Sequence, residues 1–242
     1  MNFIKQQDQN QAQSFDGNAT IVKNFMSNVF SWMGIAMTMT AVTAYFFAND
    51  ESLMRLLVNE TGGMSILGWV VMLAPLGLVL WLSRGFQRMS YGTLVIVFSV
   101  FSVLMGMSLS FILLAYTGAS IAQTFVTTAV MFGVMAVVGF TTKTDLTKFG
   151  AILFMALIGI IIASVINMFL GSGMMDYIIS FIGVLIFTGL IAYDVQKLKK
   201  IGSGLMYQNQ DANKLAIMGA LSLYLDFINL FLFLLRFMGN RR

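Results

Sequence analysis

Residues 150–170 read GAILFMALIGIIIASVINMFL, an apolar run that contains no charged side chain. A helix rises about 1.5 Å per residue, so a run of this length spans about 30 Å, the thickness of the hydrocarbon core of a bilayer. Membrane-spanning β-strands alternate apolar and polar residues over about ten positions. This run does not alternate, so it predicts a membrane-spanning α-helix.

Six more apolar segments of similar length surround it, at roughly 25–48, 66–83, 92–115, 119–140, 177–196 and 214–237. Of the 242 residues, 58% are hydrophobic and only 10% are charged, whereas a soluble domain is about a quarter charged. The mean hydropathy is +0.85. We therefore expect an all-α integral membrane protein: residues 23–242 form a bundle of seven transmembrane helices, and residues 1–22 form a polar, disordered tail.

The orientation follows from the basic residues, which concentrate in the tail and in the even-numbered loops: Lys5, Lys23, Arg84, Arg88, Lys143, Lys148, Lys197, Lys199, Lys200 and Lys214. The odd-numbered loops contain only Arg55. Because basic loops stay in the cytoplasm, the tail and the even loops are expected there. Arg236, Arg241 and Arg242 conflict with this pattern, since seven full spans place them outside. A re-entrant last segment would return these arginines to the cytoplasm, but the hydropathy of that segment favours a seventh full span.

The chain contains no cysteine and no histidine. Disulfides and thiol catalysis are thereby excluded, and proton sensing near neutral pH requires a carboxyl group with a raised pKa. No histidine–glutamate metal motif or phosphate-binding glycine loop is present. We expect no enzyme activity and no resident cofactor. The formal charge of +4 lies in short loops, which favours contact with lipid head groups over nucleic acid.

Two aspartates stand out in the last two segments. Asp226 lies near the middle of LSLYLDFINLFLFLL, where an ionised carboxylate costs about 2.5–3.5 kcal/mol on insertion. Asp194 ends the apolar part of FTGLIAYDVQKLKK and is its candidate partner. Two carboxylates held together cannot both ionise cheaply, so a buried pair is expected to titrate as a unit. The two meet only if the sixth helix continues past Lys197–Lys200 or the seventh starts late.

An intramembrane aspartyl protease would also use two aspartates on facing helices. Its signatures are only half present, since Tyr193 and Asp194 match Tyr-Asp but Asp226 lacks the preceding glycines.

The chain resembles the Bax inhibitor-1 family, also called the transmembrane Bax inhibitor motif family, in its bacterial form. The resemblance rests on RMS at 88–90, SLSFILLAYTGASIAQTF at 108–125, GFTTKTDLTKFG at 139–150, IGVLIFTGLIAYDVQKLK at 182–199 and GALSLYLDFINLFLFLLRFMGNRR at 219–242. It covers nearly everything after the tail. It implies six helices around a central seventh.

The resemblance also implies a pH-sensitive calcium leak with a di-aspartyl sensor, whose positions match Asp194 and Asp226. The sensor includes an arginine of the second helix, for which Arg88 is the first choice and Arg84 the second. Ca²⁺ would bind the two aspartates only in transit. The alternative is a regulator of a membrane-anchored AAA protease in the bacterial inner membrane, which would bind its partner through the tail. Transport of another solute stays open.

Overall fold

The computed structural model describes the backbone of residues 2–59, 63–205 and 211–242, and side chains from residue 19 onward within these ranges. In these ranges the chain forms the helices α1 (Asn2–Asn49), α2 (Glu51–Leu57), α3 (Ile66–Gly85), α4 (Tyr91–Ala115), α5 (Gly118–Thr141), α6 (Thr147–Leu170), α7 (Gly173–Gly204) and α8 (Ala212–Met238).

Seven of these helices are long and apolar enough to cross a membrane, which confirms the predicted fold class. In α1 the spanning part is Ala19–Asn49. The remaining helix, α2, has 7 residues and lies in the first loop, so it is too short to cross a membrane. The apolar pattern did not predict it. Asp50 caps its start by accepting the backbone N–H groups of Ser52 and Leu53.

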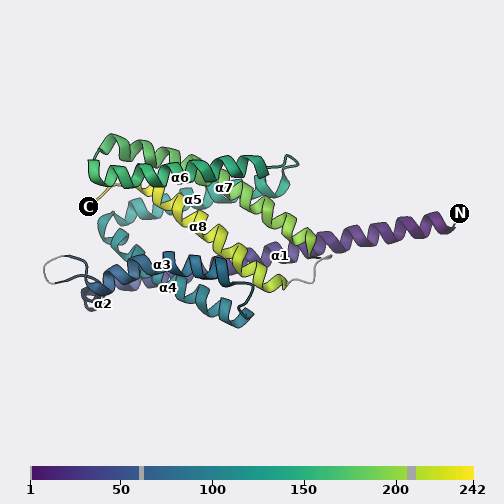
Figure 1. Cartoon of the computed structure of the whole chain (residues 1–242), viewed down its shortest axis with the longest axis horizontal. Coiled ribbons are helices and arrows are strands. Elements are labelled where there is room, and N and C mark those ends of the chain that lie inside the picture. The colour runs from purple at the N-terminus through teal and green to yellow at the C-terminus, as the bar shows by residue number, and fades with distance from the viewer. Residues whose placement is uncertain (1, 60–62, 206–210) are drawn as a thin grey trace.

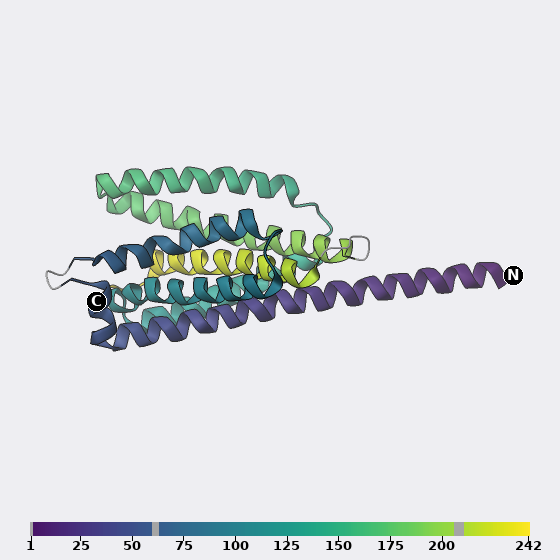
Figure 2. The same cartoon turned by 60° about the horizontal axis from the view of Figure 1, so that its bottom comes forward.

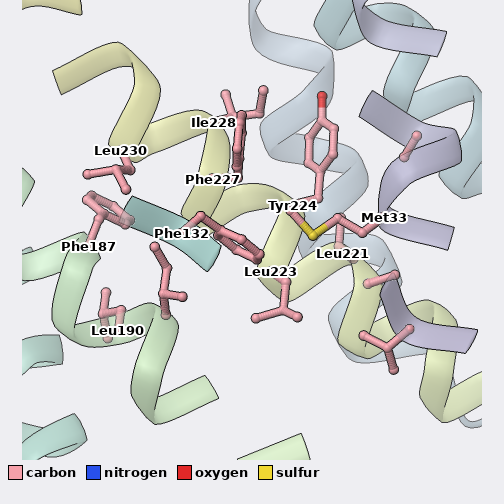
Figure 3. Close-up of a cluster of buried hydrophobic side chains, with 14 of the residues drawn as sticks. Met33, Phe132, Phe187, Leu190, Leu221, Leu223, Tyr224, Phe227, Ile228 and Leu230 are labelled. Atoms are coloured by element: carbon pink, nitrogen blue, oxygen red, sulfur yellow. The ribbon is translucent and has the colours of Figure 1, made fainter. Parts of the chain in front are cut away.

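The last helix lies in the middle of the bundle. Both views show α8, drawn in yellow, running between the other helices (Figures 1 and 2). It packs against α1, α4, α5 and α7. Figure 3 shows its buried side chains among those of its neighbours, including Met33 of α1, Phe132 of α5 and Phe187 of α7. A helix buried on most of its faces can carry apolar residues on most of its surface, as α8 does.

The chain is already helical at Asn2, so the structure differs from the expected disorder of the tail. Residues 2–16 contain neither glycine nor proline, so the backbone of α1 has no helix breaker there. The N-terminal part of α1 extends past the bundle, and the C-terminus lies at the opposite end (Figure 2). Since α8 is one continuous helix of 27 residues, the last segment does not fold back on itself and is long and apolar enough for a full span.

The residues after α8 attach to the turn between α4 and α5. The Thr117 N–H donates to the Asn240 carbonyl at 3.1 Å, and the Arg242 N–H donates to the Ala115 carbonyl at 3.0 Å. The Arg241 side chain donates to the Tyr116 hydroxyl at 3.4 Å, an interaction that raises the pKa of Arg241. Arg236 pairs with Asp176 of α7 at 3.4 Å. Two of the arginines that conflicted with the charge pattern therefore have local partners.

Candidate functional site

Asp194 lies on the face of α7 that packs against α8, and its side chain is buried. The Ser222 hydroxyl of α8 donates a hydrogen bond of 2.8 Å to its Oδ2. Ser222 precedes Asp226 by four residues, so the two side chains lie on the same face of α8, one turn apart. Asp194 is thus held against the turn of α8 that carries the second aspartate.

The carboxyl groups of Asp194 and Asp226 lie near each other across the α7–α8 contact and line the same cavity. A hydrogen bond between two carboxyl groups requires a proton on one of them, because an ionised carboxylate only accepts. Asp226 is buried, and among the described residues no N–H, serine, threonine or tyrosine hydroxyl donates to its Oδ2. The structure therefore brings two buried carboxyls close together, one of which has an oxygen atom without a donor.

The sequence left open whether Asp194 and Asp226 lie at the same depth in the membrane, and the length of α7 explains how they can meet. This helix continues past Lys197–Lys200 to Gly204, and α8 begins at Ala212. Asp194 is therefore about 15 Å from the end of its helix and Asp226 about 21 Å from the start of its own. Both carboxyls lie well inside their helices, where they meet.

The loop between α5 and α6 is attached to α7 next to Asp194. Gln196 is buried and makes two hydrogen bonds of 2.8 Å, from its amide nitrogen to the Thr144 carbonyl and from the Leu146 N–H to its amide oxygen. Lys200 pairs with Asp145 of the same loop at 2.6 Å. This hydrogen bond with Lys200 is the main reason that the pKa of Asp145 is lowered to about 2. These contacts fix the part of α7 that carries the first aspartate.

A cavity of about 500 Å³ adjoins the pair, between α3, α6, α7 and α8. Its polar lining consists of Asp194, Ser222, Asp226, Asn229 and Ser164. Ser222, Asp226 and Asn229 follow one another at spacings of four and three, so they form one stripe along α8. The remaining lining is apolar and includes Leu76 of α3, Leu157 of α6 and Phe187 of α7.

The oxygen atoms of this stripe are the ligands that a cation would meet. Ca²⁺ takes six to eight oxygen ligands in stable protein sites. No cluster of three or more carboxylates exists in the described ranges of the chain. Among the described residues, the only carboxylates that line this cavity are therefore those of Asp194 and Asp226.

Neither arginine at the end of α3 reaches the aspartates. The side chains of Arg84 and Arg88 are exposed and make no hydrogen bond or ion pair with a described residue. The cation that acts on Asp194 is Lys197, three residues further along α7. The assignment of Arg88 to the sensor has no contact to support it.

Two residues of α8 near Asp226 were missed in the sequence, Ser222 and Tyr224. Ser222 has a usable signal, because a hydroxyl four residues before a buried aspartate shares its helix face. Tyr224 has none. Its hydroxyl lies 2.7 Å from the Thr40 hydroxyl of α1, which itself donates to the Ser102 carbonyl of α4 at 2.9 Å. That network depends on the relative rotation of three helices.

Residues 22–242 match the sequence profile of the family described as Inhibitor of apoptosis-promoting Bax1. The inner membrane protein YbhL of Escherichia coli strain K12 is 46% identical over 222 residues, which cover 91% of this chain and 93% of that protein. An uncharacterised protein of Rickettsia prowazekii is 44% identical, with 91% of each chain covered. One from Borreliella burgdorferi is 43% identical, with 92% of this chain and 94% of that protein covered.

Proposed function

The chain belongs to the Bax inhibitor family of integral, multi-pass membrane proteins, and on this premise we propose that it is a pH-sensitive calcium leak of a bacterial inner membrane, gated by Asp194 and Asp226. The inner membrane is the location that the name of the Escherichia coli relative gives. The basic loops favour a cytoplasmic N-terminus.

The observation that supports the gate is the proximity of the two buried carboxyls across the α7–α8 contact. When both carboxyls ionise, two like charges lie close together in a medium of low dielectric constant, where they repel strongly. The contact between α7 and α8 at this level then weakens. The protonation state of one pair is thereby coupled to the packing of the central helix.

The cavity beside the pair supports a path for the ion. A cation that enters it meets the polar stripe of Ser222, Asp226 and Asn229 on α8. Ionised carboxylates attract Ca²⁺, and the small number of oxygen ligands keeps the binding weak enough for release. The proposed role requires no catalytic group and no resident cofactor.

The experiment is calcium flux into proteoliposomes that contain the full chain, measured over a pH series. The double variant D194N/D226N keeps two polar side chains of similar size but cannot ionise. We expect it to lose the pH dependence of the flux. The matched control is E51Q, which removes an exposed carboxylate of α2 in the first loop. If the double variant retains the wild-type flux and pH profile, the proposal fails.

A second candidate function is regulation of a membrane-anchored AAA protease. It is favoured by the N-terminal part of α1, whose helix extends beyond the bundle (Figure 1). Deletion of residues 1–20 distinguishes the two functions. It abolishes partner binding under this candidate and leaves the calcium flux intact under the first.

A further inference from the structure

A groove of about 350 Å³ separates α1 from α5, and it shares no lining residue with the aspartate cavity. Its α1 wall includes Lys23, Met26 and Phe30, and its α5 wall includes Ala136, Val137 and Phe140. Met26 and Ala136 are buried, so they form the floor. Phe30 and Val137 are exposed to 37% and 62%, so they form the rims that face the lipid.

The groove is closed toward the middle of the membrane. There, the ring of Phe30 meets the ring of Phe132 edge to face, with 6.5 Å between their centroids. From Lys23 to Phe30 the groove is about 10 Å deep along α1. Its interior is apolar, so water would find too few hydrogen-bond partners there. An acyl chain is the apolar ligand that the surrounding bilayer supplies.

The other end of the groove carries positive charge. Lys23 is exposed and has no partner among the described residues. Lys199 of α7 donates to the Phe140 carbonyl at 2.7 Å, and its Nζ lies 5.0 Å from the centre of the Phe140 ring. Gly202, one turn beyond Lys199, lies against Val22 and Phe25 of α1. Both ammonium groups therefore lie at the same end of the bundle, above the apolar groove.

We propose that this groove binds one anionic phospholipid, with an acyl chain between α1 and α5 and the phosphate near Lys23 and Lys199. No acidic side chain lines the groove, and Lys199 pairs with a carbonyl and with no carboxylate in the described part of the chain. Positive charge over an apolar slot complements a lipid that joins a phosphate to a hydrocarbon chain. Basic pockets between membrane helices on the cytoplasmic side bind such head groups.

The test is native mass spectrometry of the detergent-solubilised full chain with added dioleoylphosphatidylglycerol. The double variant K23Q/K199Q is expected to bind it about 30-fold more weakly, because one basic residue at an anionic surface contributes about fivefold. S27F, which fills the groove from its exposed α1 wall, should also abolish binding. The matched control K148Q removes an exposed cation near the start of α6 and should bind as the wild type does.

A labelling experiment gives an independent readout. The chain has no cysteine, so S27C carries the single thiol. Phosphatidylglycerol should slow its reaction with a maleimide, and inorganic phosphate should not. The proposal is overturned if K23Q/K199Q or S27F binds phosphatidylglycerol like the wild type. It is also overturned if phosphatidylcholine binds equally well, or if phosphate alone protects the thiol.

Discussion

Tyr224 and Asp226 lie two residues apart on α8 and point to opposite sides of it. Each residue of a helix is rotated by about 100° from the one before, so two residues correspond to about 200°. Tyr224 faces α1 and α4, where its hydroxyl meets that of Thr40 at 2.7 Å. Asp226 faces α7 and the carboxyl of Asp194. The tyrosine thus sets the rotation at which the central helix presents its carboxyl.

Y224F tests this relationship. The change removes one buried hydroxyl and keeps the ring that packs edge to face on Phe98 and Phe101. Thr40 keeps its bond to the Ser102 carbonyl. We expect the variant to lose about 1 kcal/mol of stability, the net value of one hydrogen bond. The measurement is denaturant unfolding in detergent. Y45F, at a side chain exposed to 62%, is the control, and an equal loss in both variants would contradict the account.

G139A tests the close approach of α5 to α7. A Cβ at Gly139 would clash with the backbone carbonyl of Ala192, two residues before Asp194. Because the obstacle is backbone, the two helices must move apart, and we expect a loss of about 1–3 kcal/mol. G133A is the matched control on the same helix. A Cβ there meets nothing within 4 Å, so the change should be neutral or stabilise by about 0.5–1 kcal/mol. The same unfolding assay decides, and a stable G139A would refute the packing argument.

Q196L tests the attachment of the α5–α6 loop to α7. Leucine fills a similar volume but leaves the Leu146 N–H and the Thr144 carbonyl without their partner. Each unsatisfied buried group costs about 1–3 kcal/mol, so we expect a loss of at least 1 kcal/mol. Q196E keeps one acceptor for the Leu146 N–H and should recover part of that loss. If Q196L unfolds at the same denaturant concentration as the wild type, the two hydrogen bonds contribute no stability.

The ion pair between Asp145 and Lys200 should contribute stability that is lost at acid pH. The pKa of Asp145 is 3.8 in an unperturbed state and about 2 in the folded protein. A lowered pKa stabilises the fold above the unperturbed value, and this contribution disappears as the pH falls from about 4 toward about 2. Thermal unfolding of the wild type and of D145N should differ by a constant small amount above pH 4 and converge near pH 2. A difference that persists at pH 2 would contradict this assignment. The pair is exposed, so added salt should also reduce the difference.

The fold was predictable because the apolar runs are continuous. The predicted segment 150–170 corresponds to Thr147–Leu170, and 92–115 to Tyr91–Ala115. The short helix α2 was not predicted because it has only 7 residues, about two turns, and lies inside a loop. The hydropathy of the seventh segment favoured a full span, although the charge rule alone favoured a return. The continuous helix α8 is long and apolar enough for that span.

The site was predictable only in part. The sequence pointed to Asp194 and Asp226, because carboxyls within apolar segments are rare and need a partner. It contained no information on the rotation of α8, so Tyr224 and Thr40 were not linked. Arg88 was chosen from a motif, whereas the structure places its exposed side chain away from the pair. Depth and rotation depend on contacts between helices, and these do not appear in the pattern of any single segment.

The pH profile of calcium flux through D226N tests the central claim most directly. The asparagine amide can donate to Asp194 as the protonated carboxyl does, but it cannot lose that proton near neutral pH. We predict a flux that does not change with pH and equals the flux that the wild type reaches at the acid end of its own profile. A D226N profile that superimposes on the wild-type profile across the whole series would contradict the gate.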